Sequence, residues 1–262
     1  MKKTPEIQDD PYKVPNLEKG LKILEVLVES QEGLTLQDIR AQVEVSQTTA
    51  YRILHTLIRM NYVYYIDHSK RYMISSKMLS LGFKTLHERN LHEIVLPYLK
   101  DIRDEVKETV CFGVMSTDKV MFLEQALGSH PFCFVLTPGK LINLHCSAPG
   151  KAILAAMPDN MRDFYIQKID FIKYNERTIT DTASYLSELD NVQKSGYALD
   201  QEEEMTGIMC IGSAILDHTG IPCGSIWLVG PKDRLDNDTI RKDAEIIKNV
   251  CLKISQELGY TK

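Results

Sequence analysis

The stretch of residues 34–74 constrains the fold more than any other part of the sequence. Its first half predicts two short helices, because Thr35 and Asp38 have the Thr-x-x-Asp spacing of a capping box and Ser46 stands where it would cap a second helix. Its second half predicts two aromatic strands around a basic turn at residues 67–70. Helix, turn, helix and hairpin in this order are typical of a winged helix-turn-helix domain, whose second helix enters the major groove of DNA.

The second of these helices has an apolar side and a polar side. Ala50, Leu54 and Leu57 recur at intervals of four and three residues, so they should face the core. The opposite side is polar, aromatic and basic and carries no acidic residue. The helix and the hairpin are therefore expected to contact base edges and phosphates through one set of side chains. That set is Ser46, Gln47, Thr48, Thr49, Tyr51, Arg52, Lys70 and Arg71.

Charge is distributed unevenly along the chain, which has a formal net charge of −5. Residues 46–77 have a formal balance of +4, whereas residues 91–262 have a balance of −7. A basic patch on an acidic protein suits sequence-selective binding with moderate phosphate contact and does not suit a non-specific polycation. The cations could instead belong to an ordinary solvated surface. Their coincidence with the capped helix and the hairpin tip favours DNA.

Length and composition indicate a cytoplasmic, two-domain protein. At 262 residues two domains are expected. No run approaches the roughly 18 apolar residues of a membrane span, and the N-terminus has no apolar core of a signal peptide. The six cysteines are widely spread without a C-x-x-C pair, which predicts buried reduced thiols. Neither a cofactor nor a metal site is expected.

The sequence divides into a flexible lead at residues 1–13, a winged helix-turn-helix domain at 14–75, a linker helix at 76–90 and a second domain at 91–262. The first domain begins with a helix from about Asn16. Four apolar residues of this helix share one face and are expected to pack on the next two helices. They are Leu17, Leu21, Leu24 and Val28.

The second domain mixes strands and helices. Strands are predicted at residues 109–115, 120–126, 132–136, 141–146, 197–200, 208–216 and 223–229. Helices are predicted at residues 91–108, 148–157, 158–168, 181–195 and 233–258, with Pro97 kinking the first or marking its start. Strands clustered at both ends of the segment indicate an α+β fold with a mainly antiparallel sheet.

Several motifs, taken in order, resemble the IclR family of bacterial transcriptional regulators from about Val14 to Tyr260. They are LTLQDI (34–39), SQTTAYRIL (46–54), Arg71-Tyr72 followed by LSLG (79–82), HCSAPGKAILA (145–155), GYALDQEEEMTGIMC (196–210) and Gly230-Pro231. The resemblance implies a winged DNA-binding domain, a helical linker and a GAF-like domain that binds a small effector. It also implies homodimers, often paired into tetramers, on palindromic operator DNA, and no enzymatic activity.

The resemblance also implies an effector site in the second domain. The matching positions are Ile142, Ala148, Pro149, Asp200, Ile208, Cys210, Trp227 and Val229. Members of the family that sense small keto acids have serines where this chain has Trp227 and Val229, which favours a larger or more apolar effector. The expected effector is an organic acid or an aromatic compound. Trp227 could equally be a core residue.

Some residues of the second domain are also compatible with other chemistry. Asp200 is followed by three glutamates, which could form a metal site but are expected to be a solvated acidic turn with only Asp200 pointing inward. His145 and Cys146 are adjacent on a predicted strand, so they should face opposite ways and not share a metal. A GAF-like thiol redox enzyme, or a regulator with a cysteine redox sensor, would need an exposed, low-pKa Cys146 or Cys210.

Overall fold

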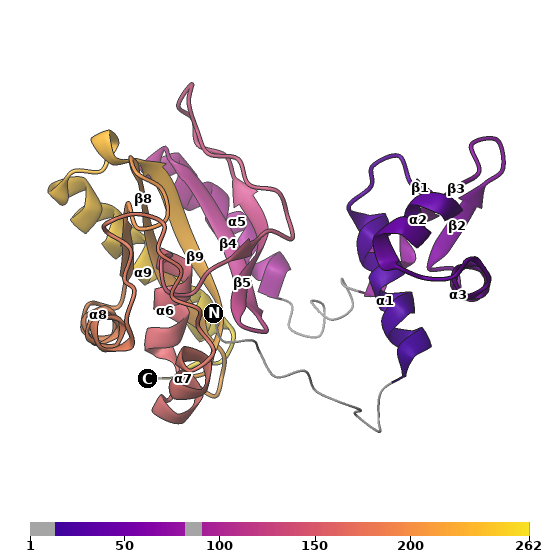
Figure 1. Ribbon diagram of the computed structural model, residues 1–262. Helices are drawn as coiled ribbons and strands as arrows, with labels where there is room; N and C mark the ends of the chain where they lie inside the picture. Colours follow the sequence, from indigo (N-terminus) through magenta and orange to yellow (C-terminus); the bar gives the residue numbers. More distant parts are fainter. Residues whose placement is uncertain (1–13, 82–90, 262) are drawn as a thin grey trace. The chain divides into compact units, whose positions relative to one another are not determined.

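The structure, a computed structural model, describes residues 14–81 and 91–261. The chain divides into two compact units, residues 1–90 and 91–262 (Figure 1). Each unit has hydrophobic core residues of its own. The lead at 1–13 lies outside the described residues, as does the 82–90 part of the predicted linker helix. Residues 77–81 of that segment are helical.

The first unit packs three helices beside a small antiparallel sheet of strand order β1-β3-β2 (Figure 1). Its elements are α1 (Pro15–Val28), β1 (Leu34–Thr35), α2 (Leu36–Val43), α3 (Gln47–Arg59), β2 (Val63–Ile66) and β3 (Arg71–Ile74). This arrangement confirms the predicted winged helix-turn-helix. The wing is the β2–β3 hairpin, in which Val63 pairs with Ile74 and Ile66 pairs with Arg71.

Local capping sets where α2 and α3 begin. The Thr35 side chain accepts the backbone N–H of Asp38 and the Asp38 carboxylate accepts that of Thr35, so the predicted capping box is present. Because Asp38 accepts hydrogen bonds from Thr35, the pKa of its carboxyl group is lowered. Glu44 ends α2 in the left-handed region, and the Ser46 hydroxyl then accepts the Thr49 N–H as the N-cap of α3.

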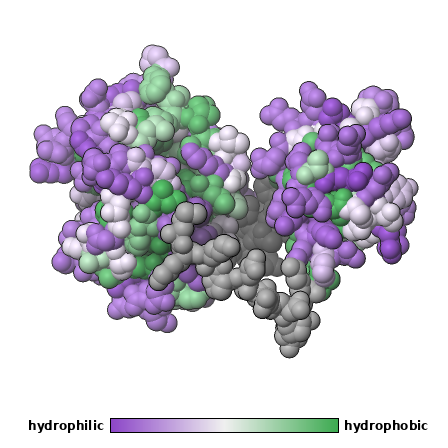
Figure 2. All heavy atoms as spheres, in the orientation of Figure 1, coloured by the Kyte–Doolittle hydropathy of each residue, from purple (hydrophilic) through white to green (hydrophobic). Residues whose placement is uncertain are grey.

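The α1 helix buries a different side from the one predicted. Ile23 and Leu27 are 0% and 1% exposed in the core of the unit, whereas Leu17, Leu21 and Val28 are 60%, 52% and 58% exposed. Apolar residues lie on two sides of this helix, and the side that carries Ile23 packs with buried residues of α2 and α3. On the face shown in Figure 2, hydrophilic side chains cover most of the first unit, with apolar atoms between them.

The second unit is built on a six-stranded antiparallel sheet of order β6-β5-β4-β9-β8-β7, which confirms the predicted α+β class. The strands are β4 (Thr109–Ser116), β5 (Lys119–Ala126), β6 (Leu141–Ile142), β7 (Ala198–Gln201), β8 (Ile208–Leu216) and β9 (Pro222–Pro231). The helices are α5 (Leu91–Val106), α6 (Ala148–Ala156), α7 (Asp159–Ile166), α8 (Thr182–Ser195), η1 (Lys232–Arg234) and α9 (Asn237–Glu257).

Helices cover both faces of this sheet (Figure 1). On β4, Val110 and Phe112 pack with α5 and α9, while Cys111 between them packs with α6 and α8. Pro97 lies inside α5 and does not mark its start. None of the helices in residues 14–81 and 91–261 is long and apolar enough to cross a membrane.

Two predicted strands of the second unit are wrong or too long. Residues 132–136 form no strand, and the strand predicted at 141–146 ends at Ile142. His145 and Cys146 lie in a turn that leads into α6. A Cβ at Gly150 would lie 2.5 Å from the Leu144 backbone, so this helix packs on its own leading turn too closely for any other residue.

Candidate nucleic-acid interface and ligand site

The polar side of α3 projects from the first unit. Gln47, Thr48, Tyr51 and Arg52 are exposed, with Tyr51 at 56%, while Ala50 is fully buried on the opposite side. The described ion pairs include none made by α3. The helix therefore presents donors and a cation to whatever approaches, as major-groove reading requires.

The cap of α3 uses two of the predicted DNA-contacting residues. The Ser46 hydroxyl donates to Thr49 Oγ1 at 2.9 Å and accepts the Thr49 N–H at 3.3 Å. Their hydroxyl groups hold the start of the helix, and Thr49 is half-buried. Any part that these two residues play at DNA is shared with this capping role.

The two basic residues of the wing differ in environment. Lys70 is exposed at the tip of the hairpin, with a left-handed backbone of φ +53°. Arg71 is half-buried, and its Nη1 donates to the carbonyl oxygen of Gly33 at 2.6 Å. The Lys70 side chain is thus open to solvent at the wing tip, whereas Arg71 already ties β3 to the turn before β1.

Sequence reasoning missed the contact between two aromatic rings of the wing, Tyr65 and Tyr72. Tyr65 is 39% exposed, and its ring lies 4.8 Å from the buried ring of Tyr72. Burial raises the pKa of the Tyr72 hydroxyl, and the nearby Tyr65 and Tyr51 raise it further. Side chains alternate along β2, so the sequence does predict that Tyr65 and Tyr64 lie on opposite faces. Only the folded hairpin brings the Tyr65–Tyr72 pair near Tyr51 of α3.

Sequence reasoning also missed a contact between α2 and the first residue of α3. Arg40 Nη1 donates to Gln47 Oε1 at 3.4 Å. The Arg40 Nε is buried and has no hydrogen-bond partner within the described part of the chain. The two residues are seven apart, on different helices, so no single helical period relates them.

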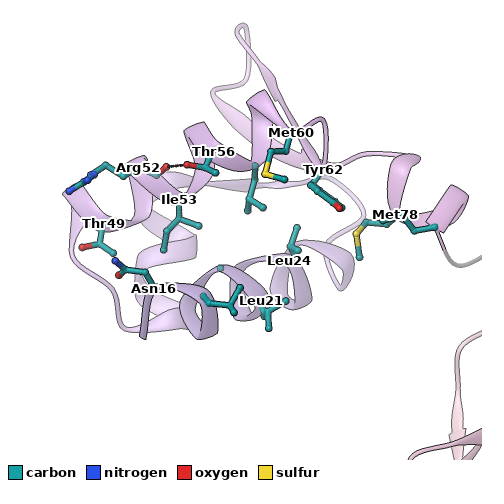
Figure 3. Close-up of a pocket in the computed structure, with 14 residues that line it drawn as sticks. Asn16, Leu21, Leu24, Thr49, Arg52, Ile53, Thr56, Met60, Tyr62 and Met78 are labelled. Carbon is teal, nitrogen blue, oxygen red and sulfur yellow. Dashed lines mark hydrogen bonds between the residues drawn. The ribbon is translucent and has the colours of Figure 1, made fainter. Parts of the chain in front are cut away.

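A groove runs between α1, α3 and residues 77–81 (Figure 3). Its volume is about 640 Å³ and its walls are mostly apolar. The lining residues are Asn16, Leu17, Gly20, Leu21, Leu24, Thr49, Arg52, Ile53, Thr56, Leu57, Met60, Tyr62, Met78 and Leu81. The exposed apolar face of α1 supplies one wall, and Thr49 and Arg52 of α3 lie at the end near Asn16 (Figure 3).

The predicted effector residues of the second unit gather on one face of the sheet. Asp200 of β7 pairs with Cys210 of β8, which pairs with Val229 of β9, so the three lie in one row across the strands. Ile142, Ala148, Cys210, Trp227 and Val229 belong to one buried cluster, and Ile208 packs against it. Pro149 is also buried, in the first turn of α6.

Gly212 lets the start of α6 approach this face. A Cβ there would lie 3.2 Å from the Trp227 Cβ and 3.3 Å from the Ala148 Cβ. Trp227 is 2% exposed and meets the Phe122 ring edge-on, with the ring centroids 6.1 Å apart. Trp227 is therefore a core residue in this structure, and it also belongs to the predicted site.

Asp200 is a buried carboxyl group, 5% exposed. Burial raises its pKa to about 7, against a hydrogen bond from the Glu203 backbone N–H that favours the ionised form, and the Glu203 charge raises it further. The charge of Lys151 lowers the Asp200 pKa in part, and Lys151 itself is fully buried and donates to Glu203 Oε1 at 2.5 Å, to Glu188 and to the Leu199 carbonyl.

The expectation of a solvated acidic turn after Asp200 is wrong for two of the three glutamates. Glu202 and Glu203 are 4% and 6% exposed. Glu202 accepts from Arg177, from Lys232 at 2.7 Å and from the Gly207 N–H, and these partners lower its pKa. In this turn each buried glutamate has a basic partner, Arg177 and Lys232 for Glu202 and Lys151 for Glu203.

His145 and Cys146 lie in a turn, so the expectation that they face opposite ways along a strand does not apply. Both residues are buried, and the His145 Nε2 lies 3.0 Å from the Ile172 carbonyl oxygen, which fixes a proton on that nitrogen. Within the described residues there is no group of three or more His, Cys, Asp or Glu side chains arranged to hold a metal ion.

The cysteines are free thiols, five of them buried and Cys133 half-buried, in line with the sequence prediction. Burial raises the pKa of the Cys146 and Cys210 thiols far above the usual value, and neighbouring acids such as Asp200 raise it further. A thiol reductase or a peroxide sensor needs an accessible thiolate. The two residues on which the redox alternative depended have the opposite environment.

Two family models match the sequence. "Bacterial transcriptional regulator IclR C-terminal" matches residues 83–256, and "IclR helix-turn-helix domain" matches residues 16–67. The regulator KdgR of Escherichia coli K12 is 25% identical over 256 residues, covering 97% of each chain. The crystal structure of Thermotoga maritima IclR has a TM-score of 0.76 and 27% identity, covering 93% of this chain and 98% of that one.

A further structure adds a bound ligand. An IclR homologue from Microbacterium hydrocarbonoxydans complexed with 4-hydroxybenzoate has a TM-score of 0.79 at 18% identity, covering 93% of this chain and 98% of that one. At this identity the likeness concerns the fold.

Proposed function

The chain belongs to the IclR family of bacterial transcriptional regulators, and from this we propose that it binds operator DNA through α3 and the wing under the control of a small effector. The observation that carries the DNA-binding part is the exposed side of α3. It presents Gln47, Thr48, Tyr51 and Arg52 with no acidic residue among them. Such a side lies in the major groove, where these side chains reach base edges and Lys70 of the wing reaches phosphate.

A substitution in α3 tests this role. Arg52→Ala lowers affinity by about 1–3 kcal/mol for the duplex with the correct base at one position, and by much less for random DNA. The measurement is a binding titration of the full chain on duplexes selected by the wild type. Equal losses on selected and random DNA would refute base reading by Arg52.

The effector site is the face of the second sheet against α6. Its support is the convergence of Asp200, Cys210, Trp227 and Val229 beside the start of α6, in a buried and mostly apolar cluster with one buried carboxyl group. An apolar surface with few polar groups suits a small organic acid or an aromatic compound. The homologue complexed with 4-hydroxybenzoate adds weight to an aromatic acid.

Self-association gives a role to the apolar face of α1. Leu17, Leu21 and Val28 are exposed along one side of α1, and the groove of Figure 3 lies beside them. A second copy can cover this face with its own, because a two-fold interface brings the same patch together from both partners. A dimer formed in this way matches the two half-sites of a palindromic operator.

The protein acts in the bacterial cytoplasm, where operator DNA is, and its role is regulation without catalysis. An effector alters DNA affinity only as far as it prefers one arrangement of the chain over another.

A further inference from the structure

We propose that Arg40 is a positioning residue for base recognition, and that it sets Gln47 to select guanine and to reject adenine at one operator position. This inference rests on the proposed function, because it takes the start of α3 to lie in the major groove. Its basis is the contact from Arg40 Nη1 to Gln47 Oε1, 3.4 Å long, between the end of α2 and the first residue of α3.

The chemistry of the two groups fixes which way round the amide lies. A guanidinium group has only donors, so it can face the oxygen of the glutamine amide and never the nitrogen. With Oε1 turned towards α2, the other edge of the Gln47 amide consists of its N–H groups. Gln47 is exposed at the start of α3, so an approaching base can meet these N–H groups.

The turn between the helices holds Arg40 in reach of Gln47. Glu44 ends α2 in the left-handed region, with φ +53° and a backbone N–H bonded to the Arg40 carbonyl. Val45 is 6% exposed in the core, and Ser46 caps α3. Because each of these three residues is fixed, the last turn of α2 and the first residue of α3 keep one separation.

Arg40 has no competing partner within the described part of the chain. It makes no ion pair there, and its Nε is buried with no hydrogen-bond partner. A buried guanidinium nitrogen leaves the side chain little freedom to swing out to phosphate. Among residues 14–81 and 91–261, the one hydrogen bond that its side chain makes is the contact with Gln47.

Base selectivity follows from the exposed edge of the amide. Glutamine reads adenine by giving an N–H to N7 and accepting from the N6 amino group, so it needs both its oxygen and its nitrogen. Guanine offers two acceptors, O6 and N7, at the same edge. An amide whose oxygen is turned towards Arg40 presents its N–H groups to the base and suits guanine, whereas the adenine amino group would meet an N–H group in place of an acceptor.

The experiment uses the full chain and a randomised duplex pool. Gln47→Ala first identifies the position that Gln47 reads, as the one where base preference is lost. Affinity is then measured for the four duplexes that differ there, with the wild type, Arg40→Met, Arg40→Lys and Arg59→Met. Methionine keeps an apolar stem without donors, lysine keeps a donor, and Arg59 at the exposed end of α3 matches the charge change without contacting Gln47.

The wild type, Arg40→Lys and Arg59→Met are expected to prefer guanine over adenine by about tenfold at that position, the size of one good base contact. Arg40→Met is expected to lose this preference as adenine binding rises, and Arg40→Met combined with Gln47→Ala should behave as Gln47→Ala alone. Thermal unfolding of each variant confirms that the domain remains folded.

Three results would overturn the proposal alone. One is an unchanged guanine preference in Arg40→Met, and another is a uniform loss on all four duplexes, which would make Arg40 a phosphate contact. The third is no change of base preference at any position in Gln47→Ala, which leaves the proposed function standing if Arg52→Ala still changes one. A wild type that selects no sequence at all would remove the proposed function as well.

Discussion

Lys70 combines an unfavourable backbone with a useful charge. Its φ of +53° at the wing tip is a conformation that costs a residue with a Cβ roughly 1 kcal/mol, and glycine adopts it freely. Lys70→Gly is therefore expected to leave the domain as stable or more stable, while DNA affinity falls on every sequence. The slope of log K against log salt should fall by about 0.9 if one phosphate contact is lost.

Urea denaturation and salt titrations of DNA binding measure the two effects of Lys70→Gly separately. Lys70→Asn is the control, because asparagine also tolerates the left-handed region and also lacks the charge. A loss confined to one DNA sequence would contradict a phosphate role for Lys70.

Asp200 makes the stability of the second unit depend on pH. Its folded pKa of about 7 lies above the unfolded value near 3.9, so between these values the folded state holds a proton that the unfolded state has released. Stability from this group is fully present below about pH 4 and is lost as pH rises to about 7. The wild type should lose on the order of 2–3 kcal/mol from this group between pH 5 and pH 8.

Asp200→Asn isolates this effect, since the amide keeps an oxygen for the Glu203 N–H and cannot ionise. As pH rises from 5 to 8, the unfolding free energy of Asp200→Asn should increase relative to that of the wild type. Asp243, whose pKa burial also raises, to about 6, contributes equally to both proteins and cancels in the difference. Parallel curves for the two proteins would show that Asp200 titrates normally.

At the scale of elements, α1 carries a prediction about assembly. Leu21 is 52% exposed on the apolar face of α1, so Leu21→Glu should change the unfolding free energy by less than about 1 kcal/mol. A buried glutamate at the centre of a two-fold contact would meet its own copy, so self-association should weaken at least tenfold. Sedimentation measures this, with Leu127→Glu, at a leucine 43% exposed in the second unit, as the control. Equal masses for Leu21→Glu and the wild type would place the dimer contact elsewhere.

Elements fixed by local chemistry were predictable from the sequence. Thr35, Asp38 and Ser46 cap α2 and α3 through hydrogen bonds between residues three apart in the sequence, so spacing alone predicts these caps. The α1 face was not predictable, because Leu21 and Ile23 lie on two apolar sides and only packing against α2 and α3 selects one. In soluble proteins an apolar stripe marks burial against something, which includes a partner as well as the core.

Long-range packing accounts for the remaining differences. The run before α6 has the composition of a strand, yet it turns after Ile142 because Gly150 brings α6 against Leu144. Lys151 is fully buried because Glu203 and Glu188 compensate its charge, and both lie at least 37 residues away. The candidate effector residues could be named by family likeness, but their shared face depends on the β7–β8–β9 register, which strand spacing alone does not supply.

For the whole molecule, regulation requires that DNA and effector influence each other through one chain. If effector changes operator affinity by a factor, operator DNA must change effector affinity by the same factor, because both are legs of one thermodynamic cycle. Typical coupling of 1–3 kcal/mol corresponds to about 5–150-fold. This reciprocity distinguishes true control from a ligand that merely stabilises the second unit.

The test begins with a thermal-shift screen of 4-hydroxybenzoate and other small carboxylates and aromatic acids on the full chain. Val229→Ala and Val110→Ala form a matched pair, since both remove the same atoms from neighbouring strands but only Val229 lies on the α6 face. The Kd of a hit should rise several-fold in Val229→Ala and stay unchanged in Val110→Ala. Calorimetry then measures how many-fold selected operator DNA changes the affinity for the ligand. DNA titrations measure how many-fold the ligand changes the affinity for operator DNA, and the two factors should be equal. A Kd unaffected by Val229→Ala would move the effector site, and unequal factors would mean that ligand and DNA do not act on one equilibrium.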